Sequence, residues 1–238
     1  MPTPFESLTV VLLMYDEEPS AGAVLDEHVA FLDGAGLDWE IVVVDDGSAD
    51  RGPELVAERA AHEPRIRLVR HERNLGMGAG LGSGIRAAGK SHFVMNAMDG
   101  QIPAAEIGAL LPLLERADIA LSTYAERRRS RGAWRDLLSR GLRAYLRVVA
   151  GIRFDLEGLY VFPCAVAREL EPRIRSSTFF YSFELVQRGI EAGLTAATTG
   201  IRVRPRAAGR SKVARPGRIA RVARDALRYR VSRHGKRP

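Results

Sequence analysis

The sequence predicts one α/β domain built on a doubly wound, mostly parallel sheet flanked by helices. Its length of 238 residues, with 46% hydrophobic and 27% charged residues, is typical of an ordinary globular domain. Short apolar runs rich in β-branched residues alternate with helical patterns through the first half of the chain. Polar residues follow each run, as expected where a buried parallel strand ends in a loop. Ligands of such sheets bind beyond the carboxyl ends of the strands.

The N-terminal half alternates regularly between the two kinds of element. The run LTVVLL predicts the first strand, and EIVVV predicts the second. The small polar residues that follow the second strand can cap the next helix. We expect strands at 8–13, 40–44, 66–69 and 92–96, and helices near 20–35, at about 51–62 and from the glycine-rich stretch 74–84 to near residue 90.

The C-terminal half is less regular. An arginine-rich segment at 126–131 leads into one of its predicted helices. We expect helices near 103–116, 133–150 and 182–192, and strands near 118–122, 159–162 and 195–203. No repeat or low-complexity linker divides the chain, so we predict a single domain over 1–215 and a basic amphipathic tail over 216–238.

The net charge of +7 conceals a strong asymmetry between the two halves. Residues 1–120 hold 9 basic and 20 acidic side chains, whereas residues 121–238 hold 27 and 9. Residues 210–238 alone contain 11 basic side chains and one acid, Asp225. Such a division predicts that the two halves face different partners.

Composition also excludes several classes of protein. The single cysteine, Cys164, rules out an intrachain disulfide framework and a multi-cysteine metal site, and it is expected to pack in the interior. No apolar run approaches the roughly 18 residues that span a bilayer, and the N-terminus lacks the basic region of a secretory signal. We therefore expect a cytoplasmic protein without membrane spans.

The glycine-rich stretch does not predict a dinucleotide site. It follows the third strand, whereas a G-x-G-x-x-G fingerprint follows the first strand of a Rossmann fold. A P-loop is absent as well. We expect these glycines to let their helix pack tightly.

Acidic residues gather at the predicted strand ends. Carboxylates brought together there can bind the base and ribose of a nucleotide and hold a divalent cation against its phosphates. Four motifs that contain these acids or lie between them occur in the same order as in the family 2 glycosyltransferases of GT-A fold, which the chain therefore resembles. The matching segments are VVLLMYDEE at 10–18, VDDGS at 44–48, NLG at 74–76 and AMDGQ at 97–101.

The resemblance extends over about residues 8–215 and is closest to the polyprenyl-phosphate branch, that of dolichyl-phosphate mannose synthase. The segment RAAGRSK at 206–212 matches the R-x-x-G-x-S-K loop of that branch in full. Arg135 and Ser139 match an Arg that precedes a Ser by four residues on a helix. Glu184 and Asp155 are similar to two further acids of the branch.

The resemblance implies an inverting transfer of sugar from a nucleotide sugar to a polyprenyl phosphate, with Mn²⁺ or Mg²⁺ as the cation. A lipid phosphate is already an anion and needs no general base. The residues expected to act in transfer are Asp99, Gln101, Arg135, Arg206 and Lys212. Those expected to bind the nucleotide sugar are Tyr15, Glu17, Asp45, Asp46, Asp99, Arg206 and Lys212, and those expected to hold the metal are Asp99 and Gln101.

Three departures from the family pattern bear on these roles. Ala97 replaces the first acid of D-x-D, so the metal is expected to be held more weakly, or through Asp99 and the donor phosphates alone. Leu13 and Asp16 replace a proline and an asparagine beside the nucleotide. Thr123 stands where the lipid-phosphate branch carries an arginine, for which the cluster at 127–129 is a substitute or merely a solvated charge run.

The C-terminal tail, residues 216–238, is relevant to whether the acceptor is a membrane lipid. Apolar residues recur there at helical spacing between arginines, which predicts a basic amphipathic helix. Such a helix either binds an anionic membrane surface or packs its apolar stripe on its own domain. Nucleic acid is a weaker alternative because no aromatic stacking run or recognition motif accompanies the basic residues.

Three hypotheses remain open from the sequence. The leading one is transfer to polyprenyl phosphate by a peripheral enzyme at the inner membrane face. In the second, the acceptor is a soluble small molecule, whose hydroxyl would need a base such as Asp155 or Glu157. In the third, the chain is a degenerate nucleotide-binding homologue, for which Ala97 is the warning.

Overall fold

A computed structural model describes residues 3–125, 141–205 and 216–234. The strands are β1 (Ser7–Met14), β2 (Asp38–Asp45), β3 (Ile66–Arg70), β4 (His92–Ala97), β5 (Ile119–Tyr124), β6 (Tyr160–Pro163) and β7 (Ala196–Ile201). The helices are α1 (Glu18–Gly34), α2 (Gly52–His62), α3 (Met77–Ala87), α5 (Cys164–Leu170), α6 (Phe180–Glu191) and α7 (Pro216–His234). Shorter elements are the 3-10 helices η1 (Ala104–Ala109), η2 (Leu111–Glu115) and η5 (Glu171–Arg173), and the π-helical turn η4 (Leu146–Ala150).

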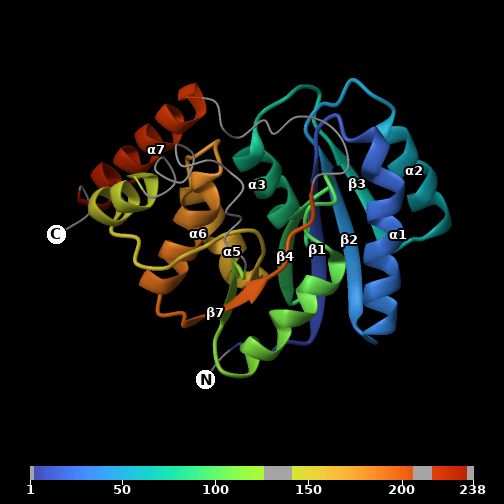
Figure 1. The fold of residues 1–238 in the computed structure, drawn as a ribbon, viewed down its shortest axis with the longest axis horizontal. Helices are drawn as coiled ribbons and strands as arrows, with labels where there is room; N and C mark the ends of the chain where they lie inside the picture. The colour runs from blue at the N-terminus through green and yellow to red at the C-terminus, as the bar shows by residue number, and fades with distance from the viewer. Residues whose placement is uncertain (1–2, 126–140, 206–215, 235–238) are drawn as a thin grey trace.

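The seven strands form one sheet in the order β3-β2-β1-β4-β6-β5-β7, with helices on both faces (Figure 1). Pairing is parallel from β3 through β4 and between β5 and β7, whereas β6 runs antiparallel to β4 and β5. The predicted fold class is therefore confirmed. Because β4 and β5 both oppose β6, they run in the same direction, and the carboxyl ends of β1, β2, β4 and β5 lie at one edge.

Alternate residues of the central strands enter two separate cores. Val10 and Leu12 pack with α1, α2, η1 and η2, whereas Val11 between them packs with α3, α5 and α6. All three side chains are fully buried. This explains the unbroken apolar run of β1, since a strand covered on both faces needs no polar side.

Helix α3 packs closely against β1, as expected from its glycines. A Cβ on Gly80 would lie 3.2 Å from Leu13 Cδ2, and one on Gly84 would overlap the Val11 side chain. Gly76, at the N-cap of α3, has φ +95°, and a Cβ there would lie 2.8 Å from the Ser177 carbonyl oxygen. The glycines thus serve packing and one left-handed turn.

Two stretches of the C-terminal half differ from the prediction. The helix expected near 103–116 consists of two 3-10 helices, η1 and η2, because Pro112 at the start of η2 prevents a continuous α-helix. Helix α5 was not expected, since it follows β6 without a loop, with Pro163 at its N-cap. Its first residue, Cys164, is buried, and burial raises the pKa of its thiol to about 12, which fits the expected packing role.

Residues 141–145 are helical and continue into η4, and we call this segment helix 141–150. Helix α7 packs against η4 and α6 through Val222, Ala226 and Tyr229, all of which are buried. The Tyr229 and Phe180 rings lie 6.0 Å apart. Residues 216–234 of the tail are thus helical, and one side of this helix packs on the domain. Within the described ranges, no helix has the length and apolar character of a membrane span.

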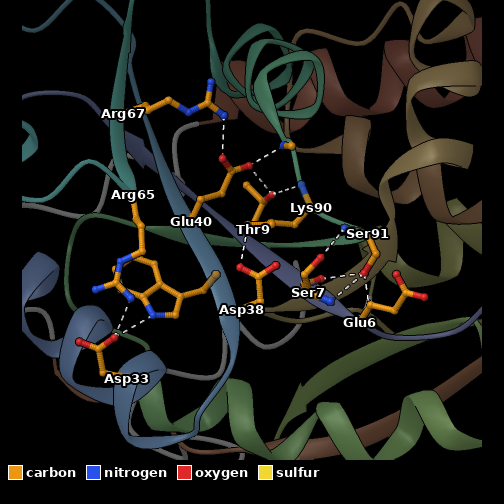
Figure 2. A network of polar contacts seen from close by, with 12 residues as sticks. Glu6, Ser7, Thr9, Asp33, Asp38, Glu40, Arg65, Arg67, Lys90 and Ser91 are labelled. Atoms are coloured by element: carbon orange, nitrogen blue, oxygen red, sulfur yellow. Dashed lines mark hydrogen bonds and ion pairs between the residues drawn. The ribbon is translucent and has the colours of Figure 1, made fainter.

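The amino ends of the strands carry a network of paired charges (Figure 2). Glu40 on β2 accepts hydrogen bonds from the Thr9 hydroxyl at 2.7 Å, from the Arg67 guanidinium at 2.9 Å and from the Gly89 N–H. Lys90 pairs with Asp38 at 2.5 Å. Burial alone would raise the pKa of Glu40, but these hydrogen bonds hold it below its usual value. The network joins β1, β2, β3 and the turn before β4.

Candidate functional site

The loop after β1 is fixed to the loop after β2. Asp16 has φ +52°, a left-handed conformation that aspartate adopts more readily than most residues. Its N–H donates to Ser48 Oγ at 2.9 Å, and its carboxylate accepts the Ala49 N–H at 3.0 Å. Tyr15 beside it is 36% exposed, and Glu17 caps α1 through its carbonyl oxygen. The first two predicted motifs, at 10–18 and 44–48, therefore meet at the carboxyl edge of the sheet.

Asp45 is the last residue of β2 and lies fully inside the protein. Its Oδ1 accepts the Ser48 N–H at 3.0 Å and closes the turn of the VDDGS motif. Its Oδ2 lies 3.2 Å from Arg70 Nε on β3. The buried Asp45 carboxylate thus stabilises the turn of its own loop, and its contact with a nucleotide stays a prediction.

Asp46 holds the third motif in place. Its two carboxylate oxygens accept the Leu75 and Gly76 N–H groups, each at 2.8 Å. His71 Nδ1 lies 2.8 Å from Asp46 Oδ1, and His71 Nε2 lies 2.9 Å from Ser83 Oγ on α3. Two motifs that are almost thirty residues apart are thereby joined. His71 was not expected here, because its partners are remote in the sequence.

The segment 97–101, which carries the predicted metal ligands and which we call the metal loop, lies at the end of β4 at the same edge of the sheet. The Met98 N–H bonds to the Leu13 carbonyl and the Asp46 N–H to the Met14 carbonyl, each at 2.9 Å, so Asp99 lies beside the ends of β1 and β2. Asp99 Oδ1 accepts the Gln101 N–H at 3.1 Å. Among the described residues, no three His, Cys, Asp or Glu side chains are grouped as metal ligands.

Asn96 does not substitute for the family's metal-binding acid, whose position is occupied by Ala97. Its side chain is buried and donates to His28 Nε2 at 3.2 Å and to the Ile102 carbonyl at 3.1 Å. His28 Nδ1 lies 2.7 Å from the Val24 carbonyl, which indicates a neutral ring with its proton on Nδ1. Burial lowers the pKa of His28, in agreement with this assignment.

The chain after β7 returns to the metal loop. The Arg204 N–H donates to the Gln101 carbonyl at 2.7 Å, and the Arg204 guanidinium binds both carboxylate oxygens of Glu27 at 3.0 Å. Arg204 is thus a positioning residue that sequence reasoning missed. The predicted phosphate-binding residues Arg206 and Lys212 come soon after it. They lie outside the described residues, as do Arg135, Ser139 and the cluster at 127–129.

The predicted acceptor residues lie on the loop before β6. Glu157 Oε1 pairs with Arg143 at 2.9 Å, and its Oε2 accepts the Tyr124 N–H at 3.2 Å at the end of β5. Asp155 is half exposed and lies 3.6 Å from Arg147. Both acids are therefore already paired with arginines, which sequence reasoning did not anticipate.

Two other residues carried over from the family occupy defined positions. Glu184 is buried on α6 and pairs with Arg188 at 2.7 Å. Burial raises the pKa of Glu184. Thr123 lies at the end of β5, where its hydroxyl is 3.5 Å from the Thr199 carbonyl.

Comparison with known proteins identifies a family. The protein-family model described as "Glycosyl transferase family 2" matches residues 9–169 of the sequence. Dolichyl-phosphate beta-glucosyltransferase ALG5C of Trichomonas vaginalis is 28% identical over 75% of this chain and 58% of its own length. Undecaprenyl-phosphate 4-deoxy-4-formamido-L-arabinose transferase of Pectobacterium carotovorum subsp. carotovorum is 30% identical over 61% of this chain and 45% of its own. The chain thus spans about half the length of these relatives.

Solved structures share the fold. Glucosyl-3-phosphoglycerate synthase from Mycobacterium tuberculosis, in complex with Mn²⁺, UDP-glucose and phosphoglyceric acid, superposes with a TM-score of 0.70 at 20% identity. The alignment covers 98% of this chain and 81% of that one. A complex of the same synthase with UDP gives a TM-score of 0.67 at 22% identity, covering 98% and 82%. At this identity the likeness establishes the fold alone.

Proposed function

Because the chain belongs to glycosyl transferase family 2, we propose that it transfers a sugar, with inversion, from a nucleotide-sugar donor to a polyprenyl phosphate. The two curated relatives named above are transferases to dolichyl or undecaprenyl phosphate, which supports this class of acceptor. The observation that carries the proposal is the meeting of the four sequence motifs at one edge of the sheet. Backbone hydrogen bonds from Met98 to Leu13 and from Asp46 to Met14 hold the three strand ends together.

The nucleotide-sugar donor would bind among acidic residues in this site. Tyr15 is exposed enough to contact a nucleotide base, and Glu17 lies beside it on the same loop. Asp46 acts by holding the 74–76 loop through two N–H groups rather than by direct contact with the donor. We assign Asp45 the same positioning role, because its carboxylate closes its own turn.

A divalent cation fits this site only when the donor completes it. Asp99 would supply one carboxylate and Gln101 an amide, while Ala97 and the inward-turned Asn96 would add no ligand. Mg²⁺ is commonly bound by one or two carboxylates together with substrate phosphates, so such a set is chemically adequate. When bound, the cation neutralises charge on the departing diphosphate. We expect weaker binding of the cation alone than in relatives with two acids.

The transfer requires no general base. An oxygen of the acceptor phosphate attacks the anomeric carbon as the bond from that carbon to the donor diphosphate breaks, and the nucleoside diphosphate leaves with the electron pair. Negative charge therefore moves from acceptor to leaving group. Arg206 and Lys212 are proposed to bind the leaving diphosphate and Arg135 the acceptor phosphate. The hydrogen bond from the Arg204 N–H to the Gln101 carbonyl supports this, because it holds a residue only two positions before Arg206 at the metal loop.

Product extraction tests the proposal. The protein is incubated with Mn²⁺, undecaprenyl phosphate and a panel of radiolabelled nucleotide sugars, and label in the organic phase is counted. We expect an organic-soluble product whose formation falls about a hundredfold or more in Asp99→Asn. Asp38→Asn is the matched control, since Asp38 lies at the opposite edge and pairs with Lys90. Label confined to the aqueous phase with every donor would refute the lipid acceptor.

A second candidate is transfer to a soluble phosphorylated acceptor. Two observations favour it: Thr123 replaces the branch arginine, and the structural neighbour is a complex with phosphoglyceric acid. A hydroxyl acceptor would need a base, and Glu157 is already engaged by Arg143 and the Tyr124 N–H. We therefore rank this candidate second. A water-soluble glycoside from the same extraction would select it.

We propose further that the protein attaches peripherally to anionic membranes through α7. Leu227 and Val231 are 51% and 65% exposed on the side of α7 away from the buried residues, and the exposed Arg224 and Arg228 accompany them. Anionic lipid attracts basic residues near its surface by about 1 kcal/mol each. We expect sedimentation with anionic vesicles but not with neutral ones, and its loss in Leu227→Asp. Equal sedimentation with both vesicle types would contradict the proposal.

A further inference from the structure

An apolar pocket opens beside the proposed acceptor residues. It lies between helix 141–150, the loop before β6 and the start of α6, and has a volume of about 150 Å³. Its apolar lining consists of Leu142, Leu146, Ile152, Phe154, Leu156, Phe179 and Phe183. The rings of Phe154 and Phe183 stack at 6.1 Å, and that of Phe179 lies 6.3 Å from Phe183, so one wall is aromatic.

Charged side chains of both signs also line the pocket, from helix 141–150 and from the loop before β6. Arg143 and Arg147 come from successive turns of helix 141–150, and each pairs with an acid of the facing loop, Glu157 at 2.9 Å and Asp155 at 3.6 Å. Arg147 is 59% exposed and its pair is long, so this guanidinium can turn to a new anion at little cost. The pocket therefore combines an apolar interior with two arginines that are each paired with an acid, and the more exposed of them, Arg147, can exchange its acid for another anion.

The pocket also lies close to the transfer site. Glu157 accepts the Tyr124 N–H at the carboxyl end of β5, the edge at which β4 delivers Asp99. The next residue, Gly158, is tightly packed, since a Cβ there would lie 3.0 Å from Ile102 Cδ1. Ile102 directly follows the metal loop. An occupant of the pocket would thus have its polar end near the donor.

On the basis of the proposed function, we propose that this pocket binds the first isoprene unit of the polyprenyl phosphate, with Arg143 and Arg147 as further cations for the acceptor phosphate, in addition to the role proposed for Arg135. An apolar cavity of about 150 Å³ lined by such side chains can hold a benzene molecule. An isoprene unit has one carbon fewer and carries a methyl branch that suits an aromatic wall. The phosphate lies directly next to this unit in the acceptor, which matches the adjacency of the apolar interior and the arginines.

Filling the pocket tests the inference. Leu142→Trp places an indole in the space, and Ala144→Trp is the matched control on the exposed side of the same helix. The acceptors are undecaprenyl phosphate and geranyl phosphate, in both of which an isoprene unit is linked directly to the phosphate. We expect Leu142→Trp to raise the KM for both acceptors about tenfold or more while the Kd of the nucleotide sugar stays unchanged. Ala144→Trp should behave as wild type.

The outcomes separate this inference from the proposed function. Lipid product with an unchanged KM for geranyl phosphate in Leu142→Trp would overturn the pocket assignment and leave the function standing. Donor binding without any lipid product from the wild type would overturn both. If Leu142→Trp fails to fold by thermal unfolding, Leu156→Trp fills the pocket from the facing loop instead. Arg147→Gln should raise the KM for both acceptors, and an unchanged KM would remove Arg147 from the phosphate site.

Discussion

At the carboxyl edge of the sheet, aspartates accept hydrogen bonds from backbone N–H groups, whereas at the amino edge acids pair with arginine and lysine side chains. Asp16, Asp46 and Asp99 each hold a loop by its amides. Asp38 and Glu40 are joined to Lys90 and Arg67 (Figure 2). The same chemical group orders loops at one edge and forms ion pairs at the other.

The difference has an electrostatic consequence. An N–H group satisfies a carboxylate oxygen without cancelling its charge, so acids held in this way contribute negative charge to the carboxyl edge. Two acids at the carboxyl edge are nevertheless paired with arginines, namely Asp45 with Arg70 at 3.2 Å and Glu157 with Arg143 at 2.9 Å. An acidic edge with ordered loops suits a cation and a donor that arrive together. The neutralised amino edge suits stability alone.

The largest effect on stability is expected from Asp46→Asn. The amide presents N–H₂ to one of the two backbone N–H groups that the carboxylate now accepts, in a largely buried position. We expect a loss of about 3 kcal/mol in the free energy of unfolding, measured with urea. Asp26→Asn, whose exposed pair with Arg59 spans 2.8 Å, is the control and should cost under about 1 kcal/mol.

The result also distinguishes positioning from direct binding at Asp46. A stable Asp46→Asn protein that binds donor as well as wild type would show that the carboxylate is dispensable for the 74–76 loop. A stable variant that loses donor binding would make Asp46 a direct ligand. Either outcome would break the proposed division of roles at the carboxyl edge.

The amino edge should respond to Glu40→Ala through stability alone. This change leaves the Thr9 hydroxyl, the Gly89 N–H and the Arg67 guanidinium without their shared acceptor. We expect a loss of about 2 kcal/mol in urea unfolding. The Kd of the nucleotide sugar should not change, and a tenfold weaker Kd would contradict the separation of the two edges.

Both edges contain a buried histidine that is neutral in the folded protein. Burial lowers the pKa of His92 to about 4 and also lowers the pKa of His28. The unfolded chain therefore binds more protons than the folded one below pH 6.5, and stability falls as the pH drops from 6.5 towards 4. Each histidine lowers the free energy of unfolding by up to about 1.4 kcal/mol for each unit by which the pH falls in this range. Unfolding free energies of wild type and His92→Gln across this range measure the share of His92, and identical slopes would contradict it.

The smallest effect is expected from Arg67→Gln. Its pair with Glu40 spans 2.9 Å, but the arginine side chain is 47% exposed. Solvent screening limits such a pair to at most about 1 kcal/mol. Urea unfolding should place this variant clearly above Glu40→Ala in stability. Equal losses in the two variants would mean that the ion pair, rather than the backbone and hydroxyl contacts, stabilises the edge.

The sequence predicted those parts of the fold in which local pattern and tertiary environment agree. Strand β1 was visible because both of its faces are buried, so its apolar run is unbroken. The acids at the strand ends were visible because parallel strands bring their carboxyl ends to one edge. By contrast, η1 and η2 were read as one helix, since their apolar spacing is similar and only Pro112 marks the break.

The contacts within the site were less predictable. His71 contacts Asp46 and Ser83, which are 25 and 12 residues away, and no local motif announces either contact. The same holds for the pocket, whose lining is drawn from positions 142 to 183. The roles of Arg135, Arg206 and Lys212 stay predictions, because these residues lie outside the described ranges.

The central claim is that the acidic carboxyl edge binds a nucleotide sugar together with a divalent cation. Calorimetric titration of UDP-, GDP- and dTDP-sugars with and without Mn²⁺ tests it directly, with Asp99→Ala as the site variant and Asp38→Asn as the control. We predict that one donor binds with Mn²⁺, that binding weakens at least about tenfold without the metal or in Asp99→Ala, and that Asp38→Asn matches wild type. Absence of binding by every donor, or equal binding by Asp99→Ala, would contradict the account.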